Sequence, residues 1–166
     1  KVVQNIYVLL GANLGDPPKT FLKAGELLSN FTTISRCSSL FITAPWEMSS
    51  NFFFHNQVIE LSTTLSPLEL LHKILEVEHS LGRQRSAATG YQDRLIDIDI
   101  LLFDEKVVNE LELKVPHPHL SKRAFALAPL LELNPELREP QTGVLYQDYL
   151  MQLQGDLVKI RKIEIN

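Results

Sequence analysis

The sequence is poor in cysteine: Cys37 is the only one in 166 residues, so no disulfide can form within the chain. It also lacks an 18-residue apolar run and a basic, then apolar, secretory leader, so neither a membrane span nor export is predicted. Basic residues number 16 against 20 acidic ones, which argues against a general nucleic-acid-binding protein. We therefore expect a cytoplasmic protein in a reducing environment, with no nucleic-acid or membrane partner.

Two motifs common in nucleotide enzymes are missing as well. There is no G-x-x-x-x-G-K-[ST] phosphate loop. No serine, cysteine or lysine stands in a recognisable nucleophile motif, which favours direct group transfer without a covalent intermediate. The apolar content of 45% is sufficient for a real core, and the length predicts a single domain over residues 1–166.

Apolar patterning and turn signals predict secondary structure in the order βαββαβ. The elements are strands at Ile6–Leu10, Thr33–Thr43, Phe53–Thr63 and Arg94–Phe103, and helices from Pro17 to about Ser29 and from Ser66 to Gly82. In the second helix Ser66 and Glu69 have the spacing of a capping box. This order is typical of a ferredoxin-like α+β fold, an antiparallel sheet with both helices on one face.

The remaining patterns complete this expected fold. The motif Gly11-x-Asn13-x-Gly15 is interpreted as a structural turn after the first strand. Leu22 is expected on or beside the buried stripe of the first helix. Beyond residue 104 we predict a hairpin, a proline-rich loop, helices near 121–127 and 146–153, and a strand-like tail. With these additions the expected architecture has three layers, α/β/α.

The most informative short motif is Asp97-Ile98-Asp99 in an apolar strand. Alternation along a strand places the two carboxylates on one face, about 7 Å apart at their bases. Magnesium prefers such oxygen ligands and takes the rest of its shell from water and phosphate. A solvated face is the ordinary interpretation of D-x-D, but here both faces are otherwise apolar: the aspartates are joined by Leu95, Leu101 and Phe103, opposite Ile96, Ile98, Ile100 and Leu102. We therefore predict a cation site.

Basic residues gather around this strand, namely Arg83, Arg85, Arg94, Lys122 and Arg123. Guanidinium groups make bidentate hydrogen bonds to polyphosphate, although ordinary surface charge is the alternative for each one alone. The polar stretch 83–93 is long for a connection and fits a lid. His117 is interpreted as a phosphate contact, with a loop or capping histidine as the alternative. Phe54 and Phe125, taken singly, are typical core aromatics.

Several of these motifs follow one another in a specific order along the chain. They are G-A-N-L-G-D, Phe54-x-Asn56, Glu78 before G-R-x-R, Arg94-x-x-Asp97-Ile-Asp99-Ile-Leu, and Val115-Pro116-His117-Pro118 followed by Arg123-x-Phe125. Over residues 6–133 this set resembles the 6-hydroxymethyl-7,8-dihydropterin pyrophosphokinases of folate biosynthesis. The resemblance implies transfer of the terminal pyrophosphoryl group of ATP to the pterin hydroxymethyl oxygen, with release of AMP. No resemblance extends beyond about residue 134.

The resemblance also implies residue roles. Asp97 and Asp99 would hold two Mg²⁺ ions and, with Arg83 and Arg94, form the catalytic group. ATP would be contacted by Glu78, Arg83, Arg85, Arg94, Ile100, His117 and Arg123. The pterin would be bound by Thr43, Ala44, Phe54, Asn56, Asp97 and Phe125. We expect a monomer whose partners are these two small molecules. The family pattern is broken at Phe54, where tyrosine is common, at Tyr91-Gln92-Asp93, and at Glu112, where some members carry a basic residue.

Two other functions remain open from the residues. One is a different two-magnesium transferase, such as a nucleotidyltransferase, which would be recognised by its nucleotide product. The other is a non-catalytic ferredoxin-like ligand-binding module, for which the paired aspartates and the basic stretch have no evident use.

Overall fold

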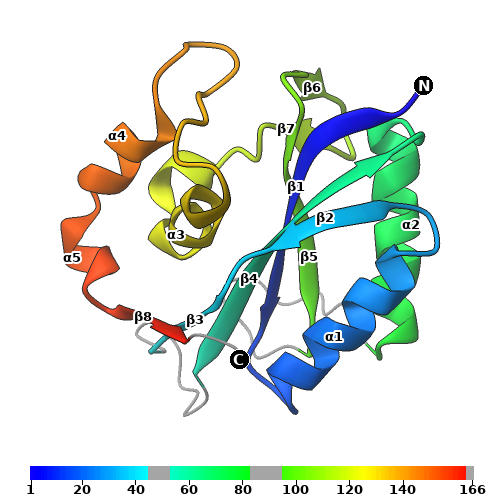
Figure 1. The fold of residues 1–166 in the computed structure, drawn as a ribbon, viewed down its shortest axis with the longest axis horizontal. Helices are drawn as coiled ribbons and strands as arrows, with labels where there is room; N and C mark the ends of the chain where they lie inside the picture. The colour runs from blue at the N-terminus through cyan, green and yellow to red at the C-terminus, as the bar shows by residue number, and fades with distance from the viewer. Residues whose placement is uncertain (45–52, 83–94, 164–166) are drawn as a thin grey trace.

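The computed structural model describes residues 1–44, 53–82 and 95–163 and shows an antiparallel sheet between two layers of helices (Figure 1). The main path of the sheet is β5-β1-β4-β3-β8, and β2 pairs with β4 beside β3. The strands are β1 (Val3–Ala12), β2 (Thr33–Cys37), β3 (Leu40–Thr43), β4 (Phe54–Thr63), β5 (Asp97–Phe103) and β8 (Ile160–Ile163). A separate hairpin consists of β6 (Val108–Asn109) and β7 (Lys114–Val115). The expected α+β order and its three layers are confirmed.

The helices divide between the two faces of the sheet, and each set encloses its own core. On one face lie α1 (Pro17–Leu28) and α2 (Pro67–Ser80); on the other lie η1 (Leu120–Lys122), α3 (Ala124–Leu133), α4 (Tyr146–Met151) and α5 (Gln154–Leu157). The first core, under α1 and α2, contains Val8, Leu10, Phe21, Leu28, Ile74, Ile98 and Ile100. The second core, under α3, contains Tyr7, Leu9, Val58, Leu101, Leu127, Leu130 and Tyr146.

Both helices of the first layer begin and end at capping signals. In α2 the Ser66 and Glu69 side chains each accept the other's backbone N–H, at 3.2 and 3.0 Å, which confirms the predicted capping box. Gly82 follows this helix with a φ of +90°, a conformation that glycine adopts without strain. In α1 Phe21, Ala24 and Leu28 face the sheet. Leu22 is 71% exposed, so its expected place beside the buried stripe was wrong.

Three predicted strands differ from the structure in extent, continuity or regularity. The predicted strand Arg94–Phe103 begins at Asp97, because Leu95 and Ile96 lie outside β5. β1 continues to Ala12, so Gly11 belongs to the strand rather than to the turn, where Gly15 has a φ of +69°. The predicted strand 33–43 is divided because the Ser38 hydroxyl, rather than a backbone carbonyl, accepts the Val58 N–H at 2.9 Å. In β5, Val8 pairs with Ile100 and Tyr7 with Leu102, which leaves Leu101 as an extra residue in a bulge. The bulge places Leu102 in the second core and Phe103 in the first, the reverse of the predicted alternation.

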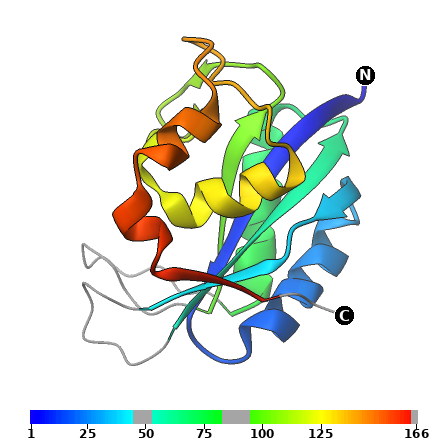
Figure 2. The same cartoon turned by 60° about the vertical axis from the view of Figure 1, so that its left-hand side comes forward.

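The C-terminal part also departs from the expected bounds. α3 begins later and extends further than the predicted 121–127 because Leu120–Lys122 form the separate turn η1. The predicted helix 146–153 is two short helices, α4 and α5. The strand-like tail is β8, which joins the sheet at the free side of β3 (Figure 2). Within ranges 1–44, 53–82 and 95–163, no helix is both long and apolar enough to cross a bilayer.

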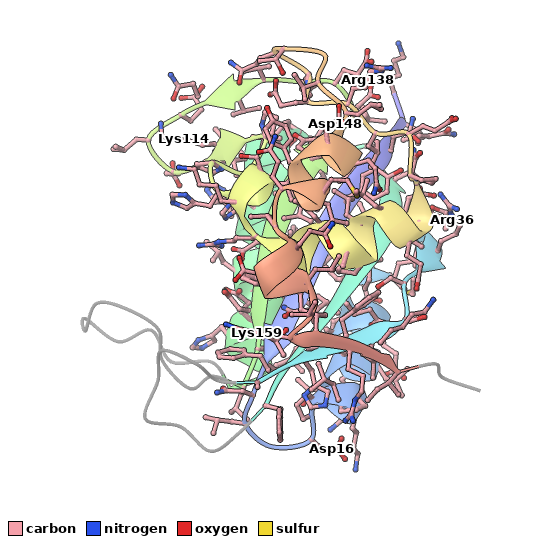
Figure 3. The ribbon with its side chains drawn as sticks, turned by 90° about the vertical axis from the view of Figure 1, so that its left-hand side faces the viewer. Asp16, Arg36, Lys114, Arg138, Asp148 and Lys159 are labelled. Carbon is pink, nitrogen blue, oxygen red and sulfur yellow. The ribbon has the colours of Figure 1, made fainter. Side chains whose placement is uncertain are left out.

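A polar network joins β1, β2 and β4 at the side where α3 ends. Glu60 accepts hydrogen bonds from the Tyr7 hydroxyl at 2.7 Å and from Arg36 at 2.8 Å. Arg36 lies at the margin of the molecule (Figure 3), and its side chain is 50% exposed. The hydrogen bond from Arg36, aided by those from Tyr7 and Ser35, outweighs burial and lowers the pKa of Glu60 to about 2.

The depressed pKa of Glu60 predicts a pH-dependent contribution to stability. A carboxyl with a lowered folded-state pKa stabilises the fold above its unfolded-state value of 4.5 and loses that contribution as the pH falls towards about 2. Glu60→Gln should therefore melt below the wild type at pH 7, and the difference in Tm should shrink between pH 4.5 and 2. Thermal melts across this range test it, with exposed Glu26→Gln as the control. A pH-independent difference would contradict the prediction.

Candidate active site

A single row of paired residues crosses the α3-facing side of the sheet. In order of the strands β5, β1, β4, β3 and β8, it consists of Asp97, Gly11, Asn56, Phe41 and Lys162. Directly opposed residues in antiparallel strands point to the same face. The row therefore presents a carboxylate at one edge of the sheet and a carboxamide near its centre, with a glycine between them.

Gly11 keeps the space between these two polar side chains open. A Cβ atom added to Gly11 would lie 3.0 Å from Asn56 Nδ2, closer than ordinary packing allows. Asn56 is 5% exposed, and its Nδ2 donates a hydrogen bond to the Leu10 carbonyl at 3.3 Å, which orients the amide. With two strand spacings between them, Asp97 and Asn56 are about 10 Å apart at the backbone. The motif Gly11-x-Asn13-x-Gly15 predicted a turn at Gly11, and it carries no signal for the register of three strands on which the role of Gly11 depends.

The aspartate pair lies on the edge strand β5, where both side chains are half-buried. Between them, the Ile98 N–H donates to Glu78 Oε2 at 2.7 Å. Glu78 is 2% exposed, so a buried carboxylate of α2 holds the backbone of β5 in place midway between Asp97 and Asp99. This second function of Glu78 was not foreseen, and its contact with ATP stays a prediction. Ile100 has its side chain in the first core, so only its backbone is suited to the predicted ATP contact.

The two aspartates of β5 suit a cation that takes its other ligands from water and from a bound substrate. The described ranges contain no group of three or more histidine, cysteine, aspartate or glutamate side chains suited to holding a metal. Two carboxylates on one strand face nevertheless match Mg²⁺, which completes its shell with water and phosphate oxygens. Asp97 and Asp99 therefore fit a magnesium site that depends on a bound polyphosphate.

His117 lies close to this acidic pair. The backbone N–H of His117 donates to the Leu101 carbonyl of β5 at 3.0 Å. The ring Nδ1 of His117 accepts the backbone N–H of His119 at 3.2 Å. Burial, then the charge of Arg123, lowers the pKa of His117 to about 4, against an opposing effect of Asp97. The imidazole is thus neutral at pH 7 with its proton on Nε2. In this state it can donate one hydrogen bond and adds no charge.

The remaining predicted pterin residues come from the end of β3, from β4 and from the start of α3. Thr43 of β3 pairs with Phe54 of β4. This pair is two residues along the strands from the pair Phe41 and Asn56, so it lies on the same face of the sheet. The Thr43 Oγ1 is buried and has no hydrogen-bond partner among residues 1–44, 53–82 and 95–163, so it is a group that a ligand could satisfy. Phe125 is half-buried at the start of α3, and the Arg123 guanidinium carbon lies 5.7 Å from the centre of its ring. Ala44 is exposed directly after β3.

The structure thus brings together most of the predicted site. Five residues share the α3-facing side of the sheet, namely Thr43, Phe54, Asn56, Asp97 and Asp99. His117, Arg123 and Phe125 come from the segment that covers this face. The predicted ATP contacts Arg83, Arg85 and Arg94 lie outside the described residues. Glu112 pairs with His72 of α2 at 3.0 Å, and both side chains are more than half exposed.

The chain is similar in sequence to proteins of one known family. The family model for 7,8-dihydro-6-hydroxymethylpterin-pyrophosphokinase (HPPK) matches residues 7–135. The chain belongs to the HPPK family. It is 42% identical over 135 residues to the 2-amino-4-hydroxy-6-hydroxymethyldihydropteridine pyrophosphokinase of Aquifex aeolicus, covering 81% of this chain and 83% of that protein. The Bacillus subtilis protein of the same name is 36% identical over 139 residues, covering 82% of each chain.

The fold of the HPPK chain also matches solved structures. A Plasmodium falciparum HPPK-DHPS protein crystallised with pteroate superposes with a TM-score of 0.77 at 15% identity, over 99% of this chain. At that identity the likeness concerns the fold alone. The chain spans 46% of the Plasmodium protein, so it corresponds to about half of it.

Membership of the HPPK family assigns the reaction. The chain transfers a pyrophosphoryl group from ATP to 6-hydroxymethyl-7,8-dihydropterin, a step of folate biosynthesis. The resemblance found in the sequence is thereby confirmed. Neither a nucleotidyltransferase nor a non-catalytic binding module agrees with this membership.

Proposed function

We propose that the α3-facing side of the sheet is the active site, with Asp97 and Asp99 as ligands of two Mg²⁺ ions. The row Asp97, Gly11 and Asn56 is the observation that supports this most strongly. It places a cation-binding acid and an oriented amide on one face, about 10 Å apart. The glycine between them leaves room for a flat substrate whose hydroxymethyl group points towards β5.

The phosphate side of the site would work by positioning and charge. In the transfer, the pterin hydroxyl oxygen bonds to the β-phosphorus, the bond from that phosphorus to the α-phosphate oxygen breaks, and AMP departs. The two magnesium ions, when bound, would neutralise the triphosphate oxygens around this centre. Neutral His117 donates its Nε2–H to a phosphate oxygen, and Arg123 supplies positive charge beside it. We assign Glu78, Arg83, Arg85, Arg94 and the Ile100 backbone to ATP, with Arg83 and Arg94 also in catalysis.

The pterin side would recognise a planar heterocycle. Phe54 on β4 and Phe125 on α3 stack on its two faces, which contributes about 0.5 to 1.5 kcal/mol per ring pair beyond burial. Asn56 Nδ2 is engaged with Leu10, so its Oδ1 accepts an N–H of the pterin. The buried Thr43 hydroxyl and the backbone at Ala44 provide further hydrogen bonds. Binding the ring in this place presents its hydroxymethyl group to Asp97.

The wider setting follows from the same proposal. We propose that the chain acts as a single domain and a monomer in the cytoplasm. Its partners are the two small substrates, with no nucleic acid.

The identity of the nucleotide product tests the proposed function. Incubation with ATP, Mg²⁺ and 6-hydroxymethyl-7,8-dihydropterin should give AMP and the pterin diphosphate in equal amounts. The products can be separated by ion-exchange chromatography, with reactions lacking pterin or Mg²⁺ as controls. Formation of ADP, or of AMP with free pyrophosphate, would contradict the proposal.

A further inference from the structure

The C-terminal strand β8 lies beyond the matched range 7–135 and yet borders the pterin side of the site. Ile160 pairs with Thr43, and Lys162 pairs with Phe41, next to Asn56 in the row. Figure 2 shows β8 beside β3 and beneath α3, and Figure 3 labels Lys159 where the strand is entered from α5. The strand is therefore a direct neighbour of residues assigned to the pterin.

The Glu132 carboxylate of α3 connects β8 to the segment that precedes β3. Glu132, near the end of α3, accepts the Ser39 N–H at 2.6 Å and pairs with Lys162 Nζ at 2.8 Å. Its side chain is 24% exposed. Burial acts to raise the pKa of Glu132, but the hydrogen bonds from Lys162 and Ser39 outweigh it, and the pKa lies below its usual value. The Glu132 carboxylate thus has a second hydrogen bond and is partly shielded from solvent, while the Lys162 side chain is 45% exposed.

The elements that Glu132 connects are those that carry the proposed pterin contacts. Ser39 directly precedes β3, which ends at Thr43. α3 extends from Ala124 to Leu133 with Pro129 inside it, so Glu132 and Phe125 belong to the same helix. Strand β8 is itself fixed on both faces, because Ile160 packs against the second core and Ile163 against the first. A shift of β8 would therefore change the spacing between β3 and α3.

We propose that β8 is a positioning strand for the pterin side of the site and that Lys162, through Glu132, is a positioning residue that sets the distance between Thr43 and Phe125. This inference rests on the proposed assignment of those two residues to the pterin. ATP binding is not affected, because β5 and β8 are the opposite ends of the sheet path.

Steady-state kinetics with each substrate varied in turn tests this role. Lys162→Met keeps the side-chain stem and removes the charge, and it should raise the KM for the pterin about threefold or more. The KM for ATP and kcat should stay within about twofold, and Lys162→Arg should restore the pterin KM. Arg161→Met is the matched control, since Arg161 loses the same charge from the other face of β8, opposite Ile42.

A second variant keeps the test valid if Lys162→Met does not fold. Glu132→Gln can still accept the Ser39 N–H but loses the ion pair, so it should raise the pterin KM in the same direction. Pterin titration by calorimetry should show the same weakening. The proposal is overturned if the folded variants match Arg161→Met in pterin KM, or if the KM for ATP rises equally. If the wild type makes no AMP with the pterin, the proposed function fails instead.

Discussion

Asp97→Asn is expected to lower turnover at least about a hundredfold while leaving the fold intact, as the loss of a main electrostatic contribution would. The amide has the shape of the carboxylate but no negative charge, so it cannot hold Mg²⁺ against water. Asp97 is half-buried at the start of β5 and paired with Gly11, and asparagine fits the same space. The same loss is expected for Asp99→Asn. The measurement is kcat at saturating magnesium and substrates, with thermal unfolding to verify the fold.

A control variant distinguishes loss of a magnesium ligand from the general effect of replacing an aspartate with asparagine. Asp104 directly follows β5, is exposed and has a φ of 54°, which asparagine tolerates well. Asp104→Asn should therefore keep near-normal turnover. If Asp97→Asn or Asp99→Asn retained the activity of this control at saturating magnesium, the metal assignment would be wrong.

Gly11→Val is expected to be the second most damaging change, with a loss of about a hundredfold in kcat/KM for the pterin. A Cβ at this position already meets Asn56 Nδ2 at 3.0 Å, and valine adds two methyl groups between Asn56 and Asp97. Displacement of a binding group by about 1 Å can cost a hundredfold in rate. Kinetics with the pterin varied measure the effect, and Gly11→Ala should show the same trend with a smaller loss.

The control for this prediction is a glycine with space around it. In α1, a Cβ added to Gly25 would have its nearest neighbour, Ile34 Cδ1, at 3.9 Å. Gly25→Ala should keep full activity and stabilise the helix by up to about 1 kcal/mol. Equal activity of Gly11→Val and Gly25→Ala would show that the space above Gly11 is not used by the substrate.

Features encoded within a few residues were predictable from the sequence. The capping box of Ser66 and Glu69 and the stop at Gly82 depend only on local backbone bonds, and both were predicted correctly. The placement of Asp97 and Asp99 on one face follows from strand alternation over three residues, which the structure retains. Ordered motifs then indicated the family.

Features that depend on pairing between distant strands were not predictable. The bulge at Leu101 is visible only when β5 is set against β1, and it reverses the faces of Leu102 and Phe103. The same holds for Gly11, whose importance arises from neighbours on β4 and β5. The interruption at Ser38 depends on a hydroxyl that replaces one backbone acceptor in the ladder.

Two residues of the site acquired functions that no motif suggests. The buried Glu78 carboxylate accepts a hydrogen bond from the strand that carries the aspartates, a tertiary contact without a local sequence signal. Lys162 lies beyond residues 7–135, which the family model matches, so only the pairing of β8 with β3 relates it to Thr43. Tertiary contacts of charged side chains such as these are found from the fold and not from the sequence.

The row from Asp97 to Lys162 also makes catalysis a sensitive measure of correct folding. A strand that slips by two residues keeps its apolar side chains towards the right core, so such an error costs little hydrophobic burial. It would, however, move its member of the row by about 7 Å and separate the acid from the amide. A misregistered chain would therefore be compact yet inactive, and specific activity would report the fraction of molecules whose strands are aligned.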